Sequence, residues 1–143
     1  MVLRLTKFSY SDIKVGDVFS FEKTMDEGVV KRFAEVSEDF SPLHVDAGYG
    51  ERTEFGANVV HGMLLGSLFS ALVGMLCPGE SALYLSQTLN FRRPVIVGSR
   101  VTAEARVVSK SDAARIIELE TRVKSINGEV LVDGVAMVKV RGN

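Results

Sequence analysis

The sequence has a single cysteine, Cys77, and only two histidines, His44 and His61. One cysteine excludes a disulfide within the chain and any zinc cluster built from cysteines. It fits a reducing compartment, so we expect a cytoplasmic protein. The two histidines and the scattered carboxylates show no metal-ligand spacing, and we therefore expect neither a metal ion nor a bound cofactor.

The chain also lacks an excess of charge of either sign. It has 17 Lys and Arg against 18 Asp and Glu, a formal net charge of −1. Without a basic field, a nucleic-acid partner is not expected. The first residues, MVLRLTKFSYSD, contain no apolar segment followed by a small-residue cleavage site, so no secretory signal is expected. Repeats and linker-like stretches are missing too, which predicts one domain over residues 1–143.

One long apolar run requires a membrane test. Residues 59–77, VVHGMLLGSLFSALVGMLC, are close to the length that spans a bilayer. Small and polar residues interrupt the run, however, and neither a Lys/Arg cluster nor an aromatic pair marks its ends. The rest of the chain also needs an apolar centre. We therefore predict a buried helix that ends at Cys77-Pro78-Gly79, with no insertion into a membrane.

Before this run, the pattern predicts a strand, a helix and a loop. Residues 17–23, DVFSFEK, alternate as in a strand. Thr24 and Glu27 match a capping box, with Thr24 as the N-cap of a helix that ends near Ser37. Residues 39–57 contain Pro42 and several glycines, and they are expected to form a loop.

After the run, the pattern changes to that of strands. Residues 82–92, 95–108, 114–126 and 129–140 are rich in Val, Ile, Leu and Thr. Asn127-Gly128 predicts a two-residue hairpin turn, and Pro94 with Gly98 predicts a kink. A helix that is apolar all round must be enclosed. The simplest enclosure is a curled antiparallel sheet wrapped around the long apolar helix, an α+β fold.

Small residues recur at every fourth position of the predicted apolar helix, at Gly62, Gly66, Ser70 and Gly74. This spacing places them along one stripe of the helix. Such a stripe lets another backbone or a thin ligand approach closely. Packing alone would also explain it, and the two interpretations are compatible.

The stretch SEDFSPLHVD, residues 37–46, places Asp39 five positions before His44. On a continuous helix the two side chains would lie roughly 140° apart. Pro42 interrupts a helix and favours an extended Ser41, so the segment must bend. A bent loop can bring the acid and the imidazole together for proton transfer. The alternative is a capping aspartate beside a packed histidine.

The start of the apolar helix, Val60-His61-Gly62-Met63, offers a second candidate feature. Helix N-termini expose unpaired N–H groups and a partial positive charge. Gly62 would allow a ligand oxygen to approach that backbone, where an N–H can stabilise a developing oxyanion. His61 could contribute to chemistry or could be a satisfied structural histidine.

Together these motifs resemble those of a known family. Asp39-x-Ser41-Pro42-x-His44, followed by Val60-His61-Gly62-Met63, is similar to the signature of the (R)-specific enoyl-CoA hydratases, also called MaoC-like or type 2 hydratases. The similarity covers roughly residues 17–140. The commoner family form has Asn where this chain has Ser41, and Ser can make a similar turn-stabilising hydrogen bond. The resemblance implies a hotdog fold and a homodimer.

The resemblance also implies the activity, which is reversible hydration of a trans-2-enoyl-CoA to an (R)-3-hydroxyacyl-CoA. Asp39 and His44 match the catalytic pair, with Asp39 as the base toward water and His44 orienting that water. Gly62 matches the glycine whose amide holds the thioester carbonyl, and Ser70 matches a serine that assists orientation. The expected acyl-binding residues are Leu65, Phe69, Tyr49 and Phe55.

Three other functions fit the same fold. A 3-hydroxyacyl-[acyl-carrier-protein] dehydratase would perform the same chemistry on an acyl group attached to an acyl carrier protein instead of CoA. An acyl-CoA thioesterase would attack the carbonyl carbon and release a thiol. A non-enzymatic acyl-binding subunit would be favoured by loss of Asp39 or His44, and both are present.

Overall fold

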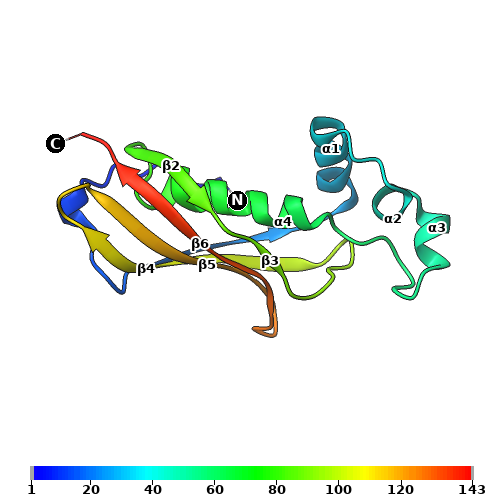
Figure 1. Cartoon of the computed structure of the whole chain (residues 1–143). Helices are drawn as coiled ribbons and strands as arrows, with labels where there is room; N and C mark the ends of the chain where they lie inside the picture. The colour runs from blue at the N-terminus through cyan, green and yellow to red at the C-terminus, as the bar shows by residue number, and fades with distance from the viewer. Residues whose placement is uncertain (1, 143) are drawn as a thin grey trace.

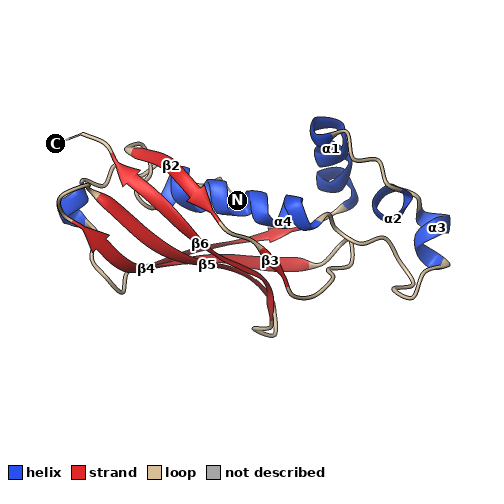
Figure 2. Cartoon of the chain, in the orientation of Figure 1, coloured by secondary structure: helices blue, strands red, loops and turns tan. Residues whose placement is uncertain are grey.

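The computed structural model, which describes residues 2–142, is built on one antiparallel sheet of six strands (Figures 1 and 2). The order is β1-β4-β5-β6-β2, and the short β3 pairs with β6 beyond the end of β2. The strands are β1 (Val18–Thr24), β2 (Ala82–Gln87), β3 (Asn90–Phe91), β4 (Arg100–Ser111), β5 (Ile116–Ser125) and β6 (Val130–Val140).

The helices occupy two places. The helix α4 (Gly62–Ala71) continues into a wider final segment, η2 (Leu72–Leu76), and the two together form the longest helical stretch, which lies along one face of the sheet (Figure 1). The other three lie beyond one end of the sheet: α1 (Glu27–Ser37), α2 (Pro42–Val45) and α3 (Ala47–Glu51). A single 3-10 turn, η1 (Tyr10–Asp12), precedes β1. The predicted helix enclosed by a curled sheet is therefore confirmed.

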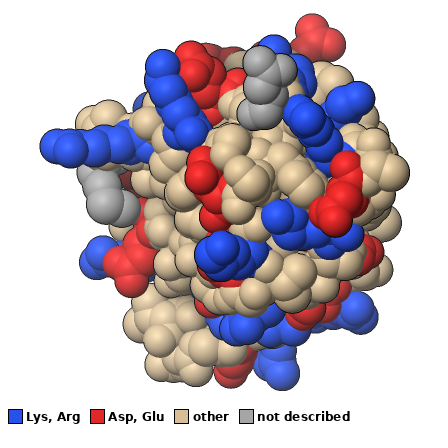
Figure 3. All heavy atoms as spheres, turned by 90° about the vertical axis from the view of Figure 1, so that its left-hand side faces the viewer, with Lys and Arg blue, Asp and Glu red and all other residues tan. Residues whose placement is uncertain are grey.

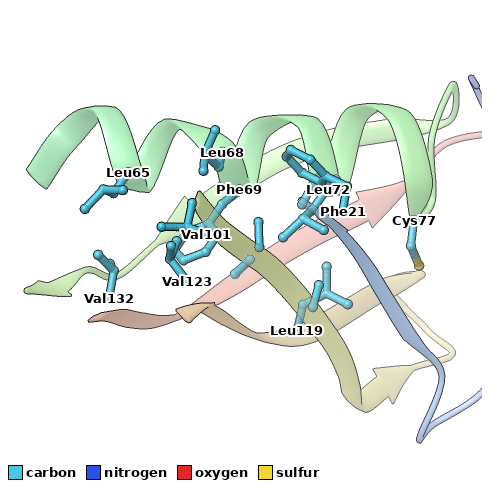
Figure 4. Packing of buried hydrophobic residues seen from close by; sticks show 14 of the residues in the cluster. Phe21, Leu65, Leu68, Phe69, Leu72, Cys77, Val101, Leu119, Val123 and Val132 are labelled. Atoms are coloured by element: carbon cyan, nitrogen blue, oxygen red, sulfur yellow. The ribbon is translucent and has the colours of Figure 1, made fainter. Parts of the chain in front are cut away.

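The core lies between α4 and the sheet. Figure 4 shows Leu65 and Phe69 of the helix above Val123 and Val132 of the sheet, and all four are at most 2% exposed. Alternate residues of β4 and β5 point into this layer, as the period of a strand requires. Full burial of each Val, Leu, Ile or Phe side chain in this layer stabilises the fold by about 1.5–3 kcal/mol. The long apolar run is thus core.

Among residues 2–142, none of the helices combines the length and the apolarity needed to cross a bilayer. On the face seen in Figure 3, acidic and basic side chains are interspersed, and neither sign dominates. This surface matches the balanced charge of the sequence.

The predicted cap of the first helix is wrong. Thr24 is the last residue of β1 and pairs with Arg100, and the backbone of Met25 still bonds to Ser99 and Gly98. Because Met25 is still bonded in this way, it cannot be the first residue of a helix, and Thr24 therefore cannot be the N-cap. Asp26 is the N-cap instead, and its Oδ1 accepts from the N–H of Val29 at 2.9 Å.

The expected loop over residues 39–57 contains two short helices, α2 and α3. Pro42 does not prevent α2, because it occupies the first helical position, where a missing N–H breaks no helical bond. Ser41 before it is extended, with ψ of 132°, as expected. The prediction that the chain bends between Asp39 and His44 is confirmed.

Two predicted strands are shorter than expected. The segment 95–97 bonds to residues 58–60 and not to the sheet, so β4 begins only at Arg100, after Gly98 with φ of +101°. The segment 82–92 is broken at Thr88, whose carbonyl crosses over Gly134 of β6. Both breaks place loop residues beside the start of α4.

The hairpin between β5 and β6 is confirmed, but its turn is longer than predicted. Ser125 bonds to Glu129, so three residues form the loop: Ile126, Asn127 and Gly128. Only Gly128 has a positive φ, +85°, whereas the predicted two-residue turn requires one at Asn127 as well.

Cys77, at the end of η2, is fully buried, and burial raises the pKa of its thiol to about 12, with a smaller contribution from Asp17. The reactive thiolate is therefore scarce at neutral pH. We expect a disulfide reagent such as DTNB to titrate far less than one thiol per native chain and one thiol in denaturant. Rapid titration of the native chain would show that Cys77 is accessible.

Candidate active site

The segment of residues 38–57, called here the overhanging segment, is tied to the start of α4 by Asn58. The side-chain amide nitrogen of Asn58 lies 3.3 Å, 3.0 Å and 2.8 Å from the carbonyl oxygens of Pro42, Leu43 and Asp46. The N–H of Val59 adds a bond to the carbonyl of Leu43 at 3.1 Å. No sequence pattern predicts this role of Asn58, because one amide among loop residues has no characteristic spacing.

Asp39 is held by its own loop. Its N–H donates to Oγ of Ser37 at 3.2 Å, and its Oδ1 accepts from the main-chain N–H of Ser41 at 3.1 Å. This turn uses only the main chain of residue 41, so the replacement of the usual Asn by Ser leaves the bond intact. Oδ2 remains free, on a side chain that is half exposed.

His44 comes from α2 and faces Asp39. Its Nε2 lies 3.8 Å from Oδ2 of Asp39, and the side chain is 15% exposed. Its Nδ1 lies 2.6 Å from the carbonyl oxygen of Val59. A carbonyl oxygen only accepts, so Nδ1 carries a hydrogen, and in the neutral ring Nε2 presents its lone pair toward Asp39. The predicted convergence of the two side chains is present.

His61 also lies here, and it completes a cluster with Asp39 and His44. One donor atom from each of the three residues lies within 4.8 Å of the others. The two imidazole rings are stacked, however, with centroids 3.9 Å apart and planes at 27°. The nitrogen lone pairs lie in the ring planes, so stacked rings cannot direct both of them at one ion about 2.1 Å away. The geometry does not fit a shared metal ion.

These residues border a cavity of about 400 Å³. Its polar end is formed by Asp39, His44 and His61, beside Gly62. The rest of the wall is mainly apolar, with two exposed arginines, and it comprises Val59, Val60, Met63, Leu65, Phe91, Arg92, Arg93, Pro94, Val95 and Val132. An apolar cavity with a few convergent polar groups is the usual form of a small-molecule site.

Gly62 is the first residue of α4, and its N–H belongs to the first turn, where helical N–H groups have no intrahelical partner. The first bond in this turn is from the N–H of Leu65 to the carbonyl of His61 at 3.2 Å. A Cβ at Gly62 would lie 2.9 Å from the ring of Phe91. Glycine is therefore needed here for close packing of Phe91 as well as for access to the amide.

The small-residue stripe is divided between two environments. A Cβ at Gly66 would lie 3.0 Å from Leu89, so the first half of the stripe is explained by packing of the chain around β3. Ser70 is exposed, and a Cβ at Gly74 would meet nothing within 4 Å among the described residues. The second half of the stripe is therefore open in the single chain.

The structure brings only some of the expected site residues together. Leu65 lines the cavity with Asp39, His44 and Gly62, whereas Phe69 is 1% exposed and packs in the core. Tyr49 on α3, Phe55 in the following turn and Ser70 on α4 are also outside the described lining of this cavity.

Other lining residues carried no signal in the sequence. Phe91, Val95 and Val132 come from strands or loops whose position depends on the break after β2. Arg92 and Arg93 also border the cavity, and Arg92 pairs with Asp133 at 3.0 Å. This guanidinium is the main reason that the pKa of Asp133 lies below its ordinary value.

The enclosed helix, the acid–imidazole pair and the glycine at the helix start are the features that the family resemblance implies, and comparison with known proteins agrees. The MaoC like domain matches residues 12–129, and the chain belongs to this family. It is 42% identical to the (R)-specific enoyl-CoA hydratase of Aeromonas caviae over 132 residues, which are 92% of this chain and 98% of that protein.

Two solved structures are similar over nearly the whole chain. The (R)-hydratase from A. caviae involved in PHA biosynthesis aligns with a TM-score of 0.88, over 90% of this chain and 98% of that one. The R-hydratase PhaJ1 from Pseudomonas aeruginosa, in its unliganded form, is 34% identical and aligns with a TM-score of 0.93, over 97% of this chain and 89% of that one. The fold is the hotdog fold.

Proposed function

We propose that the protein is an (R)-specific enoyl-CoA hydratase, which adds water reversibly to a trans-2-enoyl-CoA. The observation that carries this proposal is the meeting of Asp39 and His44 in a cavity that also borders Gly62 at the start of α4. The 42% identity to the hydratase of A. caviae supports it independently.

The Asp39–His44 pair has the spacing for one water molecule. A separation of 3.8 Å between Oδ2 and Nε2 is too long for a direct hydrogen bond. It suits a water about 2.8 Å from each atom, because both atoms are acceptors. Asp39 takes a proton from the water molecule as the oxygen of that water forms a bond to C3 of the substrate. A proton from the pair returns to C2, so the pair ends in its starting protonation state.

Gly62 supplies the complementary electrostatics. As water attacks C3, negative charge moves onto the thioester oxygen. An N–H at the start of a helix carries a partial positive charge and is fixed before the reaction, so it stabilises that oxygen in the transition state. Removal of one such donor typically costs about 10²–10³-fold in rate. The apolar wall around Leu65 and Val132 would receive the start of the acyl chain.

No cofactor is needed for this reaction beyond the thioester substrate itself. We expect a homodimer, as the family resemblance implies. The exposed Leu83 and Leu85 on the edge strand β2 and the exposed Met63 on α4 support a second chain on these surfaces. A cytoplasmic location stays an expectation, supported by the lone free cysteine.

A substrate panel tests the proposal. Crotonyl-CoA and longer enoyl-CoA thioesters should lose the absorbance of the conjugated double bond without release of thiol, and the product should be the (R)-3-hydroxyacyl thioester. Matched enoyl thioesters of an acyl carrier protein test whether the acyl group is carried by CoA or by that protein. Faster turnover of the carrier-protein thioesters would favour the dehydratase alternative. Thiol release with an intact double bond would identify a thioesterase, and the buried Cys77 should add little background to that measurement.

A further inference from the structure

His61 contacts both members of the catalytic pair. Its Nε2 lies 3.0 Å from the main-chain carbonyl oxygen of Asp39, and its ring stacks on that of His44 at 3.9 Å. Phe33 of α1 packs against the same ring at 4.9 Å. The side chain is 2% exposed, so its orientation is fixed by these neighbours.

The hydrogen bond determines which nitrogen of His61 carries the hydrogen. The carbonyl oxygen of Asp39 only accepts, so Nε2 donates and Nδ1 is left as a bare lone pair. Nδ1 is buried and has no hydrogen-bond partner among residues 2–142. A second hydrogen there would be a buried donor without an acceptor, which is costly. The environment therefore suits a fixed donor and not a proton carrier.

The backbone of His61 begins α4. It is the N-cap residue, its carbonyl accepts the N–H of Leu65, and the next N–H in the chain is that of Gly62. One residue thus joins the helix start to the loop of Asp39 and the ring of His44. The distance between the amide that receives the thioester oxygen and the pair that activates water depends on this connection.

We propose that His61 is a positioning residue for the hydration reaction: its Nε2–H holds the Asp39 loop, and through it the carboxylate, in register with Gly62. This inference rests on the proposed function, because it assumes that Asp39 and His44 act on the substrate. A misplacement of about 1 Å can cost about 10²-fold in rate.

Two substitutions separate the hydrogen bond from the ring. His61→Phe keeps an aromatic ring against His44 and Phe33 but lacks the donor, and His61→Gln keeps a donor but lacks the ring. For crotonyl-CoA, we expect His61→Phe to lower kcat by about 10–10²-fold with KM within about 3-fold, and His61→Gln to stay within about 5-fold of the unchanged enzyme. Thermal stability should rank the other way, with Phe above Gln.

That reversed order would not arise if His61 only filled space. If activity follows thermal stability, or if His61→Phe turns over normally, the proposal is wrong. The pH dependence of kcat should keep its shape in both variants, and loss of one limb would make His61 a proton carrier instead. In an Asp39→Asn background, His61→Phe should cause less than about 3-fold further loss, because the two changes disturb one unit. A fully multiplicative further loss would also contradict it.

The unchanged protein offers a test that needs no folded variant. With only two histidines in the chain, the nitrogen-15 NMR spectrum of the imidazoles should show opposite tautomers, the hydrogen on Nδ1 of His44 and on Nε2 of His61. A hydrogen on Nδ1 of His61 would overturn the inference. Normal activity of Asp39→Asn would instead refute the proposed mechanism itself. If Asp39→Asn is inactive but His61→Phe has normal activity, only the proposed role of His61 is refuted.

Discussion

Asp39→Asn is expected to reduce turnover of crotonyl-CoA by at least about 10²-fold while the chain stays folded. Asn has nearly the shape of Asp and can still accept the N–H of Ser41 through its side-chain oxygen. It has no carboxylate to take a proton from water. The measurement is kcat and KM from the absorbance of the conjugated thioester, with circular dichroism to confirm folding.

His44→Gln should have a loss of the same order, because it removes the Nε2 lone pair that faces Asp39. Asp46→Asn is the matched control for the aspartate variant. It makes the same chemical change in the same segment, at the N-cap of α3, where Asn caps as well as Asp. Near-normal turnover in either site variant would remove that residue from the mechanism, and a large loss in the control would point to the segment's structure instead.

A large loss of stability is expected for Gly134→Ala. A Cβ at this position would lie 1.8 Å from the carbonyl oxygen of Thr88, where the chain passes from β2 to β3 over β6. The carbonyl cannot move freely, because the N–H of Thr88 bonds to Val135 at 3.0 Å. We expect the free energy of unfolding to fall by about 3 kcal/mol and Tm to fall by about 6–12 °C.

The same substitution should lower activity, since β3 carries Phe91 and leads to Arg92 in the cavity wall. Gly28→Ala in α1 is the control. Its Cβ would meet only side-chain atoms at 3.4 Å, and Ala favours a helix, so Tm should be unchanged or higher. A Tm for Gly134→Ala within about 2 °C of the unchanged protein would show that the crossing at Thr88 can relax.

The elements that sequence patterns predicted well are those whose pattern arises from burial. The apolar run of α4 and the Val- and Ile-rich strands form the core, so their composition and hydrophobic period are enough to identify them. Their ends were less predictable because long-range pairing sets them. Thr24 belongs to β1 because it pairs with Arg100. Residues 95–97 lie outside the sheet because Ile96 pairs with Val59.

The site shows the same division. Asp39, His44 and Gly62 could be recognised because their types and spacing form a motif, and Pro42 required the bend that brings the first two together. Phe91 and Val132 could not be recognised, since they reach the cavity only through pairing of β3 with β6. The sequence leaves two interpretations for His61, because its partners, the Asp39 carbonyl and the His44 ring, reach it only in the folded chain.

The segment that carries Asp39 and His44 contributes little to the hydrophobic core. Of the overhanging segment, residues 38–57, only Val45 packs against the hydrophobic core, and it does so partly buried. A graft that replaced this stretch would have to supply again an acceptor for the buried Nε2–H of His61 and a donor for the carbonyl of Val59. A replacement of equal span that provides these two bonds would leave the packing between α4 and the sheet in place.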